Sequence, residues 1–111
     1  MAKEITYNKL VRDNIHDIIR SQGNDCTVTT LNDDMYIFEL KRKLVEECGE
    51  LADAETREQV VEEFADVYEV CEALSSALNL TQTEIDNARE QKAARNGRFL
   101  QKLFLQTVIE K

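Results

Sequence analysis

The sequence predicts an all-α fold, a bundle of about four helices, and three observations support this prediction. The 111-residue chain has no proline and only three glycines, so few residues interrupt long helices. Apolar residues recur at spacings of three and four over two long stretches, as on the packed face of a helix. Two threonines are followed three residues later by Gln or Glu, which is a pattern that starts helices. The length fits one domain, residues 1–111.

The first expected helix spans about 13–22. Its isoleucines have helical spacing, Asp13 is a candidate cap, and Gly23-Asn24 ends it. The segment 26–31 follows, and its β-branched, alternating residues predict a short strand or an extended link.

Two long helices are expected next, at about 33–55 and 57–79. Asn32 precedes the first, and Thr56 with Gln59 has the form of a capping box for the second. Because the connection is tight, we expect the two helices to be antiparallel neighbours. Their predicted core stripes are Ile37, Leu40, Leu44, Cys48 and Leu51, and then Val60, Phe64, Val67, Cys71, Leu74 and Leu78.

The last expected helix spans about 82–95. Thr81 and Glu84 form its capping box, and Asn96-Gly97 is the expected left-handed stop. An apolar C-terminal tail, residues 99–109, follows, and we expect it to pack on the bundle or on a second subunit.

Composition limits the classes of partner. Fourteen Lys and Arg against 22 Asp and Glu give a net charge of −8, which disfavours nucleic-acid binding because phosphates are held by cations. The amino terminus lacks an apolar signal core and no apolar run reaches membrane-spanning length, so we expect no membrane partner and a cytoplasmic location. The three cysteines predict neither a disulfide framework nor a metal site.

Two acidic clusters are the main functional signal. Glu46, Glu47 and Glu50 lie on one long helix, and Glu63 and Asp66 lie on the next. Residues three apart are neighbours on a helix surface, so antiparallel packing would bring like charges together. Such oxygen ligands suit Mg²⁺ or Mn²⁺, and the pattern therefore predicts a metal-dependent site. The alternative is a solvated acidic face whose carboxylates pair along the helix with Lys41, Lys43 and Arg57.

The order of motifs resembles that of the all-α nucleoside triphosphate pyrophosphohydrolases, the group that includes the MazG proteins and phosphoribosyl-ATP pyrophosphohydrolase. Its signature is Glu-Glu-x-x-Glu followed by Glu-x-x-Asp, as at Glu46 to Asp66. The segment 8–13, Asn-Lys-Leu-Val-Arg-Asp, is similar to the amino-terminal element of a short MazG-like branch. Lys92, Gly97 and Phe99 resemble that branch's Lys-x₄-Gly-x-Phe element.

The resemblance implies an enzyme and its residues. It implies Mg²⁺-dependent cleavage between the α and β phosphates of nucleoside triphosphates, giving a monophosphate and pyrophosphate. The implied metal ligands are Glu47, Glu50, Glu63 and Asp66. The implied catalytic residues are Glu46 and Glu47, with Glu46 holding a second metal or orienting the attacking water. The candidate substrate-binding or subunit-contacting cations are Lys9, Arg12, Lys92 and Arg95.

The chain departs from the branch in two places. Ile15-His16 stands where Ile-Pro is usual, which a helix accommodates without difficulty. Asn96 stands where the branch has Arg, so contacts from that position are lost, with Arg95 or Arg98 as substitutes.

Two other functions remain open from the sequence. One is the phosphoribosyl-ATP pyrophosphohydrolase reaction of histidine biosynthesis, which uses the same chemistry. The other is a non-catalytic helical interaction module whose acidic face binds a basic partner. The apolar tail and the resemblance both favour a homo-oligomer, a dimer or a tetramer.

Overall fold

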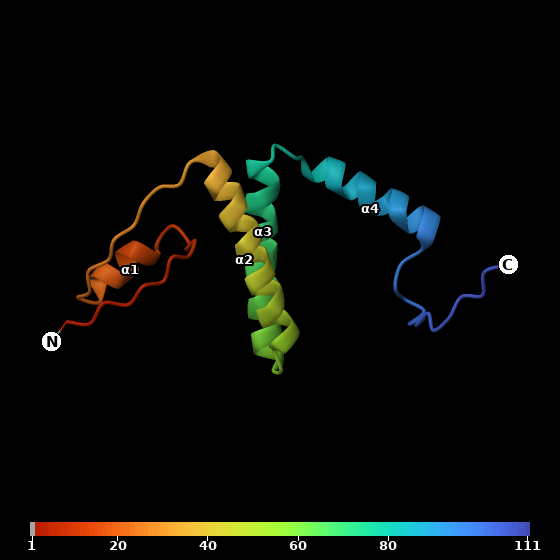
Figure 1. The fold of residues 1–111 in the computed structure, drawn as a ribbon, viewed down its shortest axis with the longest axis horizontal. Helices are drawn as coiled ribbons and strands as arrows, with labels where there is room; N and C mark the ends of the chain where they lie inside the picture. The colour runs from red at the N-terminus through yellow and green to blue at the C-terminus, as the bar shows by residue number, and fades with distance from the viewer. Residues whose placement is uncertain (1) are drawn as a thin grey trace. The chain divides into compact units, whose positions relative to one another are not determined.

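The computed structural model describes residues 2–111 and contains helices but no strand in that range. The elements are α1 (Ile15–Ser21), α2 (Asp33–Asp53), α3 (Arg57–Ala77) and α4 (Gln82–Asn96) (Figure 1). The chain divides into two compact units, one ending at Asn79 and the other spanning Leu80–Lys111, and each is described by itself. The prediction of an all-α chain with four helices in this order is confirmed.

Side-chain caps set the starts of the three longer helices. Asn32 accepts a hydrogen bond from the Met35 backbone N–H at 2.9 Å, which begins α2. Thr56 and Thr81 both form complete capping boxes, which begin α3 and α4 as predicted. Each cap satisfies amide groups that have no partner within the helix. The predicted cap of α1 is wrong, because Asn14 occupies that position, not Asp13, and makes no side-chain cap.

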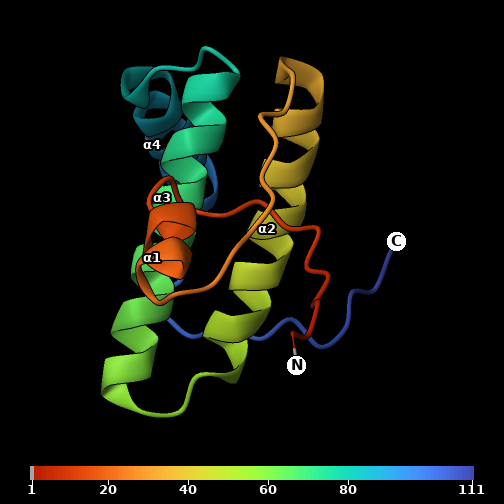
Figure 2. The ribbon, with the colours of Figure 1, turned by 90° about the vertical axis from the view of Figure 1, so that its left-hand side faces the viewer.

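Helices α2 and α3 form an antiparallel hairpin and pack side by side along their length (Figures 1 and 2). The seam between them buries Leu40 to 3% exposure and Val70 to 9%. No other apolar side chain among residues 2–111 is buried to this degree. Glu47 lies in the same seam at 6% exposure. The hairpin therefore has a small core that contains a carboxylate.

Part of the predicted core is wrong, because some of the predicted core residues do not lie on the helix face that contacts the neighbouring helix. Cys48, Phe64, Cys71 and Leu78 were expected in the core, but all are exposed. Glu63 instead occupies part of the face of α3 that is turned toward α2. The apolar residues of α3 cover more than one face, so their spacing alone does not show which face contacts the neighbouring helix.

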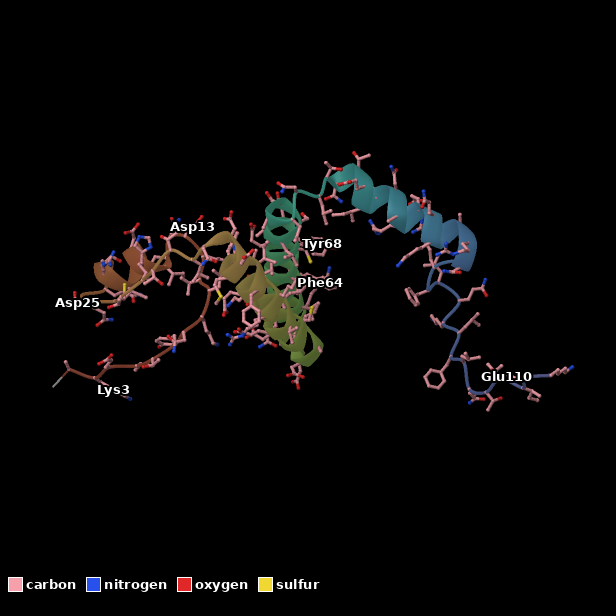
Figure 3. The ribbon with its side chains drawn as sticks, turned by 45° about the horizontal axis from the view of Figure 1, so that its top comes forward. Lys3, Asp13, Asp25, Phe64, Tyr68 and Glu110 are labelled. Carbon is pink, nitrogen blue, oxygen red and sulfur yellow. The ribbon has the colours of Figure 1, made fainter. Side chains whose placement is uncertain are left out.

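The hairpin has two chemically different sides. Counting about 100° per residue from the seam, Glu46 and Asp66 fall on one side, and Cys48 and Phe64 fall on the other. We call the side with Glu46 and Asp66 the acidic side. The amino-terminal segment that precedes α1 lies along it, because Lys9 pairs with Glu46 and Arg12 pairs with Asp66. Phe64, with Tyr68, points away from that segment (Figure 3). We call the second side the apolar side; its exposed members are Cys48, Phe64, Tyr68, Cys71 and Leu78.

The segment 26–31 is extended and pairs with no strand in the described chain, so of the two predicted forms the extended link is observed. The link connects α1 to α2. Cys26, at its start, is half-buried, and its thiol lies 3.9 Å from the His16 carbonyl oxygen.

The second unit contains α4 and the C-terminal tail. Gly97 ends α4 with φ +83° and ψ −172°, a conformation that glycine accommodates readily; the predicted stop is at the expected residue, but it is not the αL conformation. The large apolar side chains of residues 99–109 are between 68% and 98% exposed, so α4 does not cover them. None of the helices in residues 2–111 is both long enough and apolar enough to cross a membrane.

The capping box at Thr56 gives a stability prediction. Thr56→Ala removes the acceptor for the Gln59 N–H, a contact of 3.1 Å, and should lower the free energy of unfolding by about 1 kcal/mol. Urea denaturation followed by circular dichroism measures this loss. Thr29→Ala, in the exposed link, is the matched control and should leave the midpoint unchanged. Equal losses in both variants would contradict a capping role.

Candidate metal centre

Three predicted acidic ligands converge between α2 and α3. Glu47 and Glu50 come from α2, and Glu63 comes from α3. One carboxylate oxygen from each lies within 4.8 Å of the other two. Their positions follow from two sequence features, the three-residue spacing of Glu47 and Glu50 and the short turn that makes the helices antiparallel.

Asp66 lies one turn beyond Glu63 and makes a different contact. Its Oδ1 accepts a hydrogen bond from Arg12 Nη2 at 2.7 Å. Asp66 still belongs to the same electrostatic cluster, because its charge contributes to the raised pKa of both Glu47 and Glu63. Its role as a fourth ligand stays a prediction.

Glu46 lies at the rim of the cluster and is paired with lysines. Its Oε1 accepts a hydrogen bond from Lys9 Nζ at 3.1 Å, and Lys43 Nζ lies 3.8 Å away. The ammonium of Lys9, assisted by that of Lys43, holds the pKa of Glu46 below its ordinary value. Glu46 is therefore an ionised acceptor at neutral pH.

Lys43 also belongs to the site. The sequence suggested this lysine only as a partner of the acids along the helix. Its Nζ lies 3.4 Å from Glu47 Oε1, four residues along α2. The signal that identifies it is this i, i+4 spacing. Lys43 is the one cation seen to approach the buried Glu47 among residues 2–111.

Two carboxylate oxygens in the cluster are buried without a partner. Glu47 Oε2 and Glu63 Oε2 make no hydrogen bond to any group of the described chain. A buried polar atom in this state costs free energy unless a proton, a water or a cation satisfies it. These oxygens come from facing helices, and the donor set contains only oxygen. This set fits a hard divalent cation such as Mg²⁺ or Mn²⁺.

The pKa values of Glu47 and Glu63 also reflect the cost of burying negative charge in this cluster. Burial raises the pKa of Glu47, and the charges of Glu50 and Asp66 raise it further, against the opposing effect of Lys43. Burial also raises the pKa of Glu63, together with the charges of Glu50, Asp66 and Glu47. Both shifts show that the site disfavours its full negative charge when no cation is bound.

The remaining predicted site residues lie in the second unit. Lys92 and Arg95 are exposed on α4. Lys92 borders a surface pocket of about 320 Å³ that is lined by residues of that unit alone. Their role in substrate binding stays a prediction. Glu62, which the helical spacing places apart from the ligands, is exposed.

Comparisons with known proteins give one limited match. No protein-family model matches the chain, and no solved structure matches it. An uncharacterized protein of Mycolicibacterium smegmatis is 44% identical over 54 residues. The match covers 49% of this chain and 55% of that relative, so the chain spans little more than half the length of the curated relative it matches. This similarity assigns no activity to the chain.

The raised pKa values predict how metal-free stability depends on pH. Between the ordinary value of 4.5 and the raised values, the folded state holds more protons on Glu47 and Glu63 than the unfolded state does. Stability contributed by these two groups therefore falls as pH rises through this window and returns as pH falls.

Glu47→Gln tests that dependence. Because the variant removes one buried charge, we expect its metal-free Tm at pH 7 to rise by roughly 2–5 °C. Its Tm should also change less than that of the wild type between pH 7 and pH 5, as measured by calorimetry in a chelating buffer. Glu62→Gln, at an exposed position, is the control and should behave as the wild type does. A lower Tm in Glu47→Gln would show that the carboxylate stabilises the metal-free fold.

Proposed function

We propose that the chain is a Mg²⁺-dependent nucleoside triphosphate pyrophosphohydrolase that acts in the cytoplasm. It cleaves the α–β phosphate bond and produces a nucleoside monophosphate and pyrophosphate. The observation that carries the proposal is the convergence of Glu47, Glu50 and Glu63, with two buried oxygens that lack a partner. The motif order seen in the sequence supports the same reaction.

The three converging carboxylates would hold the cation, with Asp66 beside them as the predicted fourth ligand. The chemistry that Mg²⁺ supplies at such a site is neutralisation of phosphate charge and a lowered pKa of bound water. Mn²⁺ has similar ligand preferences and is the expected substitute.

The side chains around the cluster can orient both water and phosphate. Glu46 is ionised and accessible, so it can accept a hydrogen bond from an attacking water. Glu46 also lines a surface pocket of about 230 Å³, together with Lys9, Arg42, Lys43 and a second acid, Glu39. Each of these cations is paired with an acid of the chain, namely Glu46, Glu39 or Glu47. An anionic substrate would therefore have to exchange with those acids to gain the positive charge in a chain of net charge −8.

The decisive experiment combines metal binding with turnover. We expect millimolar Mg²⁺ to raise the Tm of the wild type, because binding to the folded state alone stabilises it. A panel of dNTPs, NTPs and phosphoribosyl-ATP, scored by pyrophosphate release, identifies the substrate and separates the two proposed reactions.

Glu50→Gln and Glu63→Gln are the informative variants. Both should lose the Mg²⁺-dependent rise in Tm and reduce turnover by roughly 100-fold or more, since each removes a charged ligand. Glu62→Gln, one residue away from Glu63, is the control and should keep both properties. An unchanged Tm at about 20 mM Mg²⁺ with no pyrophosphate release would favour the interaction module over the enzyme.

We also propose that the chain forms a homo-oligomer through the apolar side of its hairpin. The hairpin buries only two apolar side chains among the residues described, Leu40 and Val70, which is a small core for two helices of 21 residues. Phe64 and Tyr68 form an exposed edge-to-face pair with ring centroids 6.1 Å apart. A second copy fits best, because two such hairpins joined by a twofold axis make a four-helix bundle.

Tyr68→Glu tests this interface. Tyr68 is 70% exposed in the single chain, so a charge there is tolerated by the hairpin but not by an apolar interface. We expect the variant to sediment as a monomer at concentrations where the wild type is oligomeric. Val28→Glu introduces the same charge at an exposed position in the link and should leave the assembly intact.

Thiol reactivity gives a second measurement of the same interface. Cys48 and Cys71 lie on the apolar side, so their reaction with a thiol reagent should slow as protein concentration rises. A wild type that remains monomeric across this range, with thiols equally reactive throughout, would contradict this interface.

A further inference from the structure

The amino-terminal segment crosses the acidic side of the hairpin and is attached to both helices. Lys9 pairs with Glu46 of α2, and Arg12 pairs with Asp66 of α3. Residues 2–11 make no backbone hydrogen bond to other parts of the described chain, and Leu10 is the half-buried apolar residue between the two cations. The two ion pairs are therefore the main specific attachments of this segment.

Both attachments are accessible to water. The side chains of Lys9 and Arg12 are 50% and 57% exposed, and the acids that they contact are about one-third exposed. Ion pairs of this kind contribute little net stability, since water screens them and two long side chains must be ordered. They can therefore be exchanged for other partners at low cost.

We propose that Lys9 and Arg12 form a cationic clasp, residues 9–12, that neutralises Glu46 and Asp66 beside the metal centre. When a divalent cation and a phosphate-containing substrate are bound, the two cations exchange these acids for phosphate oxygens. The inference rests on the proposed function. Its basis is that the clasp and a divalent cation are alternative sources of positive charge for one carboxylate cluster.

Competition at Asp66 is the first step. The Arg12 guanidinium holds Asp66 at 2.7 Å, while the neighbouring Glu63 offers a buried oxygen with no partner. A cation bound among the acids repels the guanidinium and takes up the negative charge that held it. The two effects are reciprocal, so Arg12 must weaken cation binding by the same factor by which the cation weakens the Arg12–Asp66 pair.

The second step gives the released side chains new partners. Lys9 borders a pocket that is also lined by Arg42, Lys43 and the acids Glu39 and Glu46. Arg12 lies three residues further along the same segment and would have to leave Asp66 to reach an anion there. An anionic phosphate chain at this pocket supplies the oxygens that a guanidinium and an ammonium prefer. The clasp thus has opposite effects on the two ligands: it opposes the cation and assists the phosphate.

Isothermal titration of Mn²⁺, and of pyrophosphate onto Mn²⁺-loaded protein, tests these opposite effects. We expect Arg12→Gln to bind Mn²⁺ about two- to fivefold more tightly than the wild type, the range that a surface ion pair provides. The same variant should bind pyrophosphate more weakly. Arg12→Lys keeps the charge, so its affinities for Mn²⁺ and for pyrophosphate should fall between those of the wild type and of Arg12→Gln.

A double-mutant cycle identifies the acid responsible. Arg12→Gln should have almost no effect on Mn²⁺ affinity when Asp66 is already Asn, because the competing pair is then absent. Arg20→Gln is the matched control; this arginine contacts the Cys26 carbonyl oxygen, not an acid, and its loss should change neither affinity. Circular dichroism confirms that all variants are folded.

The outcomes separate the clasp from the proposed function. A wild type that binds no Mn²⁺ overturns both. A wild type that binds Mn²⁺, with Arg12→Gln indistinguishable from it in both titrations, overturns the clasp alone. Tighter Mn²⁺ binding that persists in the Asp66→Asn background would show a general charge effect, and it too overturns the exchange at Asp66.

Discussion

The structure depends on the seam in which α2 packs against α3, because that seam provides both the core of the hairpin and the candidate site. Leu40 and Val70 supply its buried apolar contact. Glu47 shares the same interior, although a buried carboxylate opposes the packing that buries it. The fold thus accepts a local electrostatic cost at the position where three acids from two helices meet. Such conflicts between local chemistry and stability are typical of functional sites.

The two sides of the hairpin differ in chemistry, and only the acidic side offsets this cost. On the acidic side, Lys9, Arg12 and Lys43 supply positive charge close to the carboxylates. On the apolar side, exposed aromatic residues provide surface that a second hairpin can bury. The first arrangement is electrostatic and is screened by water and salt, and the second is hydrophobic. The proposed cation site and the proposed assembly surface therefore lie on different sides of the same two helices.

Local patterns in the sequence predicted most of the helices and the convergence of three acids between two of them. Capping boxes at Thr56 and Thr81 located two helix starts, since a cap is a short-range signal between residues three apart. The acids Glu47 and Glu50 could be placed beside the second helix because spacing and a short turn determine their direction. These predictions needed no knowledge of distant contacts.

Long-range geometry accounts for what the sequence did not predict. Arg12 and Asp66 are 54 residues apart, and no local rule pairs them. Phe64 and Cys71 were placed in the core because the apolar residues of α3 form a broad band, and spacing does not show which part of it faces α2. The apolar side chains of the C-terminal tail are exposed, and their own pattern does not indicate what would cover them.

The brevity of the turn between Asp53 and Arg57 has a kinetic consequence. Helices joined so closely meet after a short search, which favours rapid formation of the hairpin. The carboxylates, in contrast, approach one another only once the helices have docked. Charge repulsion in the seam therefore acts late, on the completed structure, and promotes opening more than it delays closing. Any ion that relieves this repulsion extends the lifetime of the folded hairpin without having to guide its formation.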